Sequence, residues 1–164
     1  MIIERMKIEH VEQVGAIEKM VYPSPWSKGA FISEIDENSF ASYYVALDDC
    51  QVIGYGGIWI ILDEAHITNL AVHPRYQRLQ VGTALLQQLI YEALAHGVRR
   101  MTLEVRFSNK IAQNLYCKFG FMPRGVRTKY YSDEDAMIMW LDDLELIKTQ
   151  LEQVRTQQIS QRRK

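Results

Sequence analysis

A strand, a tight loop and the start of a helix follow one another in the middle of this sequence, from Asn69 to Ala84. Asn69 to Val72 is a short aliphatic run, Pro74 ends it, and an apolar pattern of helical period begins at Val81. The first N–H groups of such a helix have no partners within it, and the positive end of the helix dipole lies behind them. A chain that folds this way presents a binding site for an anion.

Arg75 and Arg78 add positive charge to this loop. Gly82 and Thr83 keep the first turn of the helix slim, so that a phosphate can approach the backbone. The same residues also fit an ordinary connection between a strand and a helix that carries surface arginines. By themselves, the residues leave both interpretations open.

The chain has 164 residues, 48% of them hydrophobic, and a formal net charge of -1. These values predict one globular domain with a full core and give no reason to expect nucleic acid as the main partner. The longest apolar run, Ile53 to Leu62, is too short to cross a bilayer as a helix, so no membrane association is expected. The four histidines show no HExxH or related spacing, and we therefore expect no metal site.

The two cysteines, Cys50 and Cys117, lack CxxC spacing and are expected to be reduced, buried thiols. Met1 to His10 contains no long apolar block, so no secretory signal is expected. Both observations favour a cytoplasmic protein.

Hydrophobic patterns predict a chain of the α/β (α+β) class. Three strands with short links are expected between Ser42 and Val72, and they indicate an antiparallel meander. From Ile67 to Val126 the pattern alternates strand and helix, which implies parallel pairing through right-handed crossovers. A last strand is expected from Ala136 to Leu141.

The loop from Tyr22 to Ser27 contains two prolines and a tryptophan, so it cannot continue the helix before it. Ser27 is predicted to cap the helix that follows. We expect the loop to be exposed enough to touch a substrate; in the alternative interpretation, Trp26 simply fills the core beneath it.

The end of the chain differs from the rest. A helical stripe continues past Asp142, and Gln157 to Lys164 is polar and basic. We predict a main domain over residues 1–144 and a C-terminal helical, basic extension over residues 145–164. The basic end, Arg162 to Lys164, is either a solvated terminus or a contact for RNA.

Four short motifs occur in a fixed order along the chain. They are Leu70-Ala71-Val72, then Arg75 to Gly82, then Leu103-Glu104-Val105-Arg106-x-Ser108-Asn109, then Leu115-Tyr116-x-x-x-Gly120-Phe121. Together they resemble the signatures of the GNAT superfamily of acyl-CoA-dependent N-acyltransferases. With Pro25-Trp26-Ser27 before them and Tyr130-Tyr131 behind, the chain resembles the RimI branch, the ribosomal-protein-alanine N-acetyltransferases.

The resemblance implies the GNAT fold, in which a mixed, mostly antiparallel sheet of about six to seven strands has a parallel pair at the cofactor cleft and helices on both faces. It also implies acetyl-CoA as cosubstrate. The residues expected at this cosubstrate are Leu70, Ala71, Val72, Gln77, Arg78, Gln80, Val81, Gly82, Thr83, Ala84 and Asn109. In the family, the strand carries the pantetheine arm, and the helix start with its arginine suits the pyrophosphate.

One position departs from the family pattern, because Gln80 stands where the phosphate loop has a glycine. A glutamine held at positive φ costs on the order of 1 kcal/mol. If nothing compensates, that cost is nearly a factor of ten in affinity for the cosubstrate. In the alternative, Gln80 lies at negative φ with its side chain in solvent.

Transfer of an acyl group from a thioester to an amine needs a neutral amine and a proton for the departing thiolate. Glu104 matches the family's base and lies off the apolar face of its expected strand. Tyr116 matches the family's acid. The other interpretations are a glutamate at the surface of a strand and an aromatic ring packed under a short helix.

The acceptor follows from the branch that the chain resembles and from amine chemistry. An α-amine, with an ordinary pKa of about 7.7 to 8.0, is partly neutral at pH 7, whereas lysine, at about 10.4, needs close to 5 kcal/mol to lose its proton. We predict acetylation of a protein N-terminus, the alanine of a small-subunit ribosomal protein. The expected borders of the peptide groove are Pro25, Trp26, Tyr130 and Tyr131; Asp133 to Asp135 either attract a basic substrate tail or are solvated.

Two other functions remain open. The same fold can acetylate a small amine such as a polyamine or an antibiotic. The chain can also be a sensor that binds acyl-CoA without catalysis; Gln80 keeps this open, while the presence of both Glu104 and Tyr116 argues against it. We expect a monomer or a weak homodimer.

Overall fold

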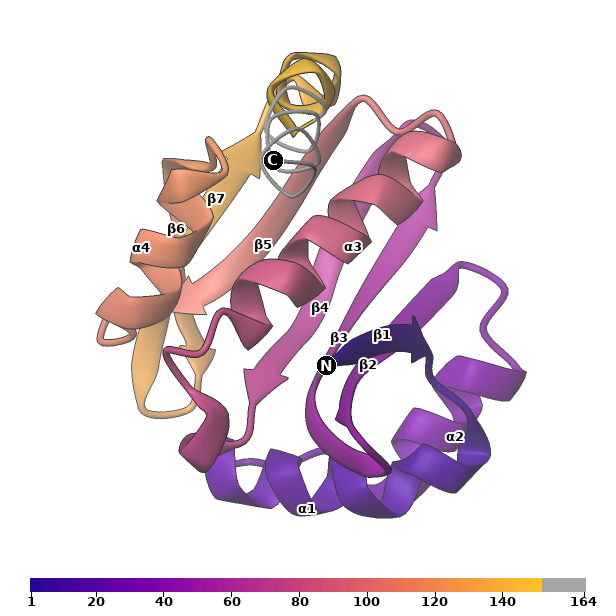
Figure 1. The fold of residues 1–164 in the computed structure, drawn as a ribbon. Coiled ribbons are helices and arrows are strands. Elements are labelled where there is room, and N and C mark those ends of the chain that lie inside the picture. The colour runs from indigo at the N-terminus through magenta and orange to yellow at the C-terminus, as the bar shows by residue number, and fades with distance from the viewer. Residues whose placement is uncertain (152–164) are drawn as a thin grey trace.

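Seven strands form one sheet in the computed structural model, which describes residues 1–151. The strands are β1 (Ile2–Arg5), β2 (Ala41–Asp48), β3 (Gln51–Ile61), β4 (Glu64–Val72), β5 (Arg100–Arg106), β6 (Met122–Tyr131) and β7 (Glu134–Leu141). Their order across the sheet is β1-β2-β3-β4-β5-β7-β6 (Figure 1). Only β4 and β5 pair in parallel, which confirms the predicted mixed, mostly antiparallel sheet.

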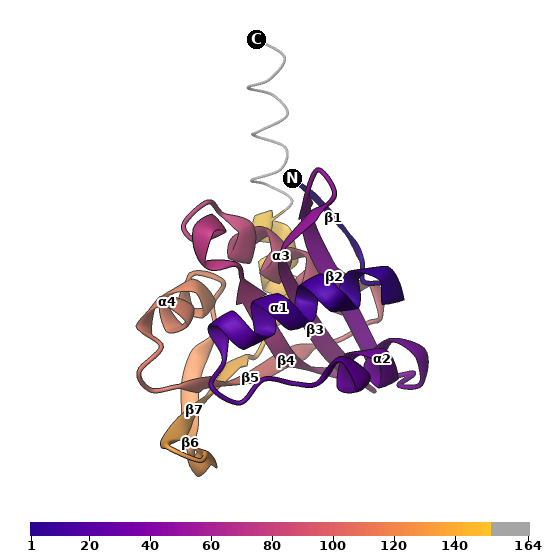
Figure 2. The same cartoon turned by 90° about the horizontal axis from the view of Figure 1, so that it is seen from below.

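Helices cover both faces of the sheet, as predicted. The first two, α1 (Val11–Val21) and α2 (Lys28–Asp36), cross one face (Figure 2). The other two, α3 (Val81–Ala95) and α4 (Lys110–Lys118), lie on the opposite face. Short 3-10 turns, η1 (Ile8–His10) and η2 (Pro74–Tyr76), follow β1 and β4. Among residues 1–151, no helix is both long and apolar enough to cross a membrane.

Each face of the sheet has its own buried cluster. On the α3 face, Leu85 and Leu89 are fully buried between the helix and the strands. On the α1 face, Ile17 and Phe31 pack against Tyr55 of β3. The two clusters hold the helices against opposite faces of β3 and β4, so that these central strands are packed on both sides.

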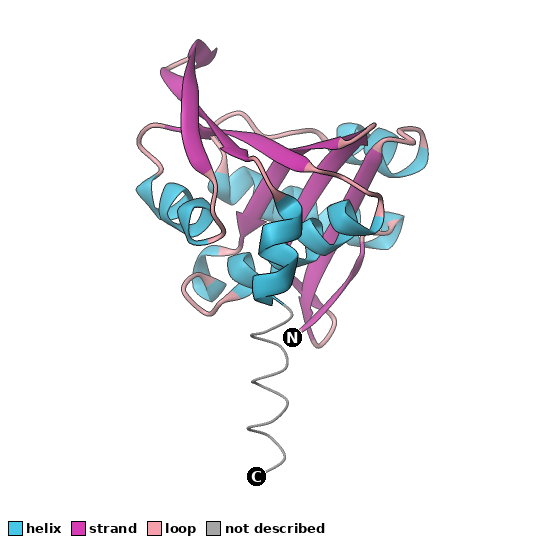
Figure 3. Cartoon of the chain, turned by 90° about the horizontal axis from the view of Figure 1, so that it is seen from above, coloured by secondary structure: helices cyan, strands magenta, loops and turns pink. Residues whose placement is uncertain are grey.

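One predicted pairing is wrong. The alternation of strands and helices implied that the strand after α4 would pair in parallel with β5. In the structure β7 takes that place, because it returns from the β6–β7 hairpin and pairs antiparallel with β5. This hairpin extends beyond the rest of the sheet (Figure 3).

The prediction of buried thiols is also wrong. Cys50 lies in the turn between β2 and β3, Cys117 lies on α4, and both are exposed. A tight turn between two strands leaves its side chains in solvent, and α4 buries the face that carries Tyr116 instead.

The predicted C-terminal extension is described only in part. Residues 144–151 are helical, and Leu144 and Ile147 are buried in the cluster on the α3 face. The remainder of the extension, with the basic residues Arg162 to Lys164, lies outside the described residues.

A bulge interrupts the pairing of β4 with β3. Gly57 of β3 pairs with Asn69 of β4. The next residue of β3, Ile58, pairs with Ile67, so that Thr68 is an extra residue with no partner. Such a bulge bends its strand and increases the local twist.

Beyond this bulge β4 and β5 diverge. Their parallel register ends where Ile67 faces Leu103, and no further pair follows (Figure 1). The buried Tyr43 of β2 stabilises the bulge, because its hydroxyl hydrogen bonds with Thr68 Oγ1 at 2.8 Å and donates to Asn69 Oδ1 at 3.1 Å. We call the divergence of the two strands beyond Ile67 and Leu103 the fork.

Replacement of Gly57 by alanine should disturb this arrangement. The new Cβ would lie 2.2 Å from Cε1 of the Tyr43 ring, which is only 4% exposed, so the ring must move away from the bulge. We expect the free energy of unfolding to fall by about 2–3 kcal/mol, measured by urea denaturation. Gly125→Ala is the control, because its Cβ would meet Ile138 at an ordinary 3.6 Å. Equal losses in the two variants would contradict the role given to Gly57.

Candidate active site

The fork leaves one edge of β4 without a strand beside it. From Thr68 to Val72, no residue of β4 is paired with a residue of β5 within the described residues. Tyr22, at the end of α1, reaches this region, and its hydroxyl donates to the carbonyl oxygen of Leu70 at 2.9 Å. An extended ligand can therefore pair with the backbone of β4 beside this contact.

The loop that follows β4 brings the start of α3 to the fork. Arg78 and Gln80 both have left-handed backbones, with φ of 62° and 65°. The alternative that placed Gln80 at negative φ is therefore wrong. Gln80 is the N-cap of α3 but makes no side-chain capping bond, and the first helical bond is from Ala84 N to Gln80 O at 3.0 Å. The N–H groups of the first turn are left available to an anion.

Small side chains bring three elements together at this helix start. A Cβ added at Gly82 would lie 3.4 Å from Leu115 of α4 and 3.6 Å from Val72 of β4. The residue before α4 is Asn109, whose side-chain Oδ1 accepts a hydrogen bond from Ala112 N at 3.1 Å. Asn109 is therefore the N-cap of α4.

Glu104 of β5 lies next to the apex of the fork, and its side chain is only 6% exposed. Its Oε2 is 2.5 Å from Nε2 of His66, and its Oε1 is 3.3 Å from Nη1 of Arg127. Burial raises the pKa of Glu104, but the hydrogen bond with His66 and the positive charge of Arg127 outweigh burial and hold the pKa below its usual value. The carboxylate is therefore ionised at neutral pH.

Tyr116 of α4 is buried on the α3 face, where its ring centroid is 5.8 Å from that of Phe121. Burial, with a smaller contribution from Tyr131, raises the pKa of its phenol. Tyr116 is therefore protonated throughout the neutral range, and it has a hydrogen to donate.

A pocket of about 300 Å³ lies between the α1–α2 loop and the β6–β7 hairpin. Its lining residues are Tyr22, Pro23, Ser24, Arg106, Tyr130, Tyr131 and Ser132. The pocket thus includes Tyr130 and Tyr131, two of the residues expected at a peptide groove. It does not include Pro25, which is exposed, or Trp26, whose ring packs against Phe31 with centroids 5.5 Å apart.

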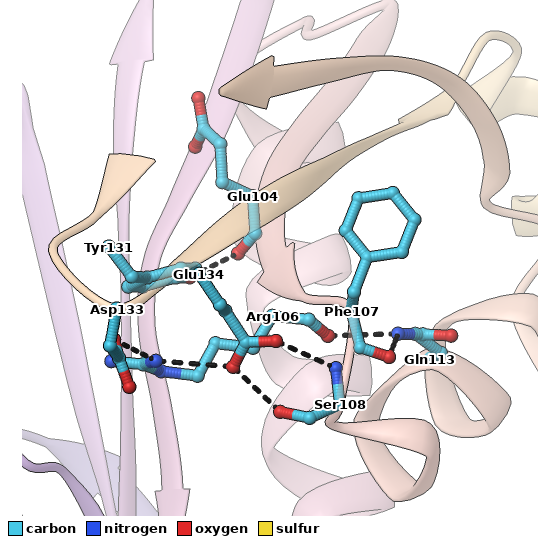
Figure 4. Close-up of polar contacts among 8 residues, drawn as sticks. All are labelled: Glu104, Arg106, Phe107, Ser108, Gln113, Tyr131, Asp133 and Glu134. Atoms are coloured by element: carbon cyan, nitrogen blue, oxygen red, sulfur yellow. Dashed lines mark hydrogen bonds and ion pairs between the residues drawn. The ribbon is translucent and has the colours of Figure 1, made fainter. Parts of the chain in front are cut away.

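Polar contacts fix the wall of this pocket (Figure 4). The Arg106 guanidinium lies over the Tyr131 ring, 4.1 Å from its centroid, and bonds to Asp133 at 2.7 Å and Glu134 at 3.2 Å. Glu134 also accepts bonds from the backbone and the hydroxyl of Ser108, at 3.0 and 2.7 Å. Asp133 and Glu134 thus pair within the protein, which leaves less of their charge for a basic substrate tail.

A further carboxylate of the same turn is also engaged, since Asp135 accepts a bond from Lys129 N at 2.7 Å. Gln113 of α4 donates to the carbonyl oxygens of Arg106 and Phe107, at 2.9 and 3.0 Å (Figure 4). These bonds hold the end of β5 against α4 and so define the side of the fork opposite β4.

Comparison with known proteins shows the family to which a chain with this architecture belongs. A family model described as the acetyltransferase (GNAT) family matches residues 11–121. This chain belongs to the GNAT family of acetyltransferases. A Bacillus subtilis protein, named provisionally a ribosomal protein bS18-alanine N-acetyltransferase, is 43% identical over 141 residues, which cover 85% of this chain and 93% of that protein.

Two solved structures show how far the likeness extends. The Escherichia coli ribosomal protein bS18-alanine N-acetyltransferase superposes with a TM-score of 0.78 at 34% identity, over 85% of this chain and 92% of that one. The PaiA N-acetyltransferase of Thermoplasma acidophilum, solved with coenzyme A, has a TM-score of 0.73 at 22% identity, over 87% and 99% of the two chains. The second likeness concerns the fold alone.

In this GNAT acetyltransferase, the structure gathers most of the predicted site around the fork. Leu70 to Val72 form one edge, the loop from Gln77 to Ala84 lies at the end of that edge, and Glu104 is at the apex. Within the described residues, no group of histidine, cysteine and acidic side chains is arranged to hold a metal ion.

Sequence reasoning missed four residues of this region. His66 and Arg127 contact the carboxylate of Glu104, and Tyr22 and Arg106 line the pocket. A signal existed for two of them, since His66 lies at a polar position between buried neighbours on β4, and Arg106 follows the buried Val105 at the end of the alternating strand β5. For Arg127 and Tyr22 the position in the chain gave no such pattern.

Replacement of Gln80 tests whether the strain of its left-handed backbone lowers the stability of the fold or the affinity for the cosubstrate. The positive φ of Gln80 belongs to the loop of the fold itself, and we expect the strain to lower folding stability and not the affinity for the cosubstrate. Gln80→Gly should raise the free energy of unfolding by about 0.5–1 kcal/mol and change the Kd for acetyl-CoA less than about twofold. Gln80→Ala keeps the Cβ and should gain nothing. A tenfold tighter Kd in Gln80→Gly at unchanged stability would contradict this interpretation.

Proposed function

We propose that this acetyltransferase transfers the acetyl group of acetyl-CoA to the N-terminal α-amine of a protein, the alanine of the small-subunit ribosomal protein bS18. The observation that carries the proposal is the ionised carboxylate of Glu104 at the apex of the fork, beside an unpaired strand edge and an open helix N-terminus. The acceptor is supported by the relatives named for this activity, at 43% and 34% identity. The proposed setting is the cytoplasm, with the enzyme a monomer or a weak homodimer.

Acetyl-CoA fits the fork by its chemistry. The pantetheine arm carries amide groups that can pair with the backbone of Leu70 to Val72 as a strand would. The pyrophosphate matches the N–H groups at the start of α3, from Val81 to Ala84, and the charge of Arg78. Gln77, Gln80 and Asn109 complete the predicted contacts.

The acceptor amine must lose a proton and then attack the thioester carbonyl. An α-amine is already partly neutral near pH 7, so one acidic residue such as Glu104, with its partners, suffices to draw the proton away. Tyr116 holds a proton that can be donated to the sulfur as the C–S bond breaks. The substrate chain itself would occupy the pocket beside Tyr130 and Tyr131.

The first test uses two basic peptides with acetyl-CoA and intact mass as the readout. One peptide has a free N-terminal alanine; the other is blocked at its N-terminus and carries lysines. We expect acetylation of the first peptide alone, because only its amine is neutral often enough to react without strong assistance.

The other outcomes would overturn the proposal in distinct ways. Label on the blocked peptide would identify a lysine acetyltransferase. No label on either peptide, with acetyl-CoA bound in calorimetry, would point to a small amine acceptor or to a sensor of acyl-CoA.

The role of Tyr116 is tested by Tyr116→Phe. The ring and its packing stay, so we expect the Kd for acetyl-CoA to change little, while kcat falls on the order of a hundredfold because the proton donor is gone. Tyr91→Phe, on α3, is a matched control and should retain full activity. Unchanged kcat in Tyr116→Phe would remove this tyrosine from the mechanism.

A further inference from the structure

Both oxygens of Glu104 are engaged by neighbouring side chains of the protein. Oε2 hydrogen bonds with His66 at 2.5 Å, and Oε1 forms an ion pair with Arg127 at 3.3 Å. The side chain is 6% exposed, and its pKa lies below the usual value. A carboxylate with these partners is a weak base that an incoming amine cannot easily reach.

The imidazole beside it has the opposite properties. The His66 side chain is 31% exposed, and only its Nε2 is bonded to another described residue. Nδ1 has no hydrogen-bond partner among the described residues and is not among the fully buried unpaired atoms, so this nitrogen is accessible from outside the pair. The His66 ring stands edge-on to the ring of Trp59, with centroids 6.3 Å apart. The Trp59 ring is itself held by its hydrogen bond to Glu34 at 2.5 Å.

The pair also lies where the reaction has to take place. His66 precedes Ile67, the last residue of β4 that pairs with β5, and Glu104 follows Leu103, the partner of Ile67. The two side chains therefore flank the apex of the fork from both strands.

We propose that His66 is the general base of the transfer. Its Nδ1 takes the proton from the substrate ammonium, while Glu104 accepts the hydrogen bond from Nε2–H, orients the ring and stabilises the imidazolium. The inference rests on the proposed function, because it concerns the route of the proton in that same reaction. It assigns Glu104 a positioning role behind the imidazole.

The step balances as follows in atoms and charge. The ammonium gives one proton to Nδ1, and the nitrogen lone pair forms the C–N bond with the acetyl carbonyl carbon. The C–S bond then breaks, the thiolate takes the hydroxyl proton of Tyr116, and Tyr116 regains a proton from the new amide nitrogen. His66 finally releases its extra proton to solvent.

The charged and titratable groups around the pair come from two further elements. Arg127, Tyr130 and Tyr131 of β6 face Glu104, and Tyr131 also donates to the backbone oxygen of Glu104 at 3.4 Å. Glu34 of α2 reaches the pair only through Trp59.

His66→Gln separates proton transfer from positioning. The glutamine amide can still donate to Glu104, but it cannot take a proton from the amine. With the alanine peptide, we expect kcat/KM to fall on the order of a hundredfold at pH 6.5. The defect should shrink to a few fold at pH 9, because the neutral fraction of an α-amine rises roughly 15- to 30-fold over this range.

The matched control is His96→Gln on α3, a histidine that bonds to the backbone of Glu92 and should keep full activity. The Kd for acetyl-CoA should stay within about twofold in both variants, which checks that they fold. A His66→Gln enzyme within twofold of the wild type overturns the proposal, and so does a defect that is the same at both pH values.

A second measurement needs no acceptor. In protein labelled with ¹⁵N-histidine, we expect the neutral form of the His66 imidazole to carry its proton on Nε2, and the His66→Gln spectrum assigns the signals. A proton on Nδ1 would overturn the proposal, whatever the peptides show. If the wild type fails to acetylate the alanine peptide, the proposed function fails, and this spectrum still decides the state of His66.

Discussion

The structure depends on a single break in the hydrogen bonding of its sheet. Gly57 leaves room for the Tyr43 ring, whose hydroxyl stabilises the extra residue Thr68, and from there β4 turns away from β5. A regular sheet would satisfy every backbone group of these strands internally and would have no place for a strand-like ligand. The bulge therefore converts the middle of a stable sheet into a binding edge.

Much of the fold could be predicted because its signals are local. The strand, loop and helix from Asn69 to Ala84 carry their own start and stop residues, and the cap at Ser27 forms as expected. The bulge could not be predicted, since a bulge depends on how β4 packs against β2 and β3. The same reason explains the strand order, where β7 displaces β6 from the side of β5.

From the sequence alone, site residues can be proposed only where they belong to a short motif. Glu104 and Tyr116 match short motifs, whereas the contact of His66 with Glu104 joins residues 38 apart through the parallel register of two strands. Likewise, the left-handed backbone of Gln80 comes from the geometry of the loop and overrides the preference of its side chain. Partners across a sheet become visible only when the register is known.

The fork also has a mechanical consequence. β1 to β4 on one side and β5 to β7 on the other are joined within the sheet by a seam of four residue pairs, with the helices packed across it. The two half-sheets are therefore joined by fewer residue pairs at this seam than along the neighbouring strand pairs β3–β4 and β5–β7. A ligand that pairs along β4 would add backbone bonds beside the seam.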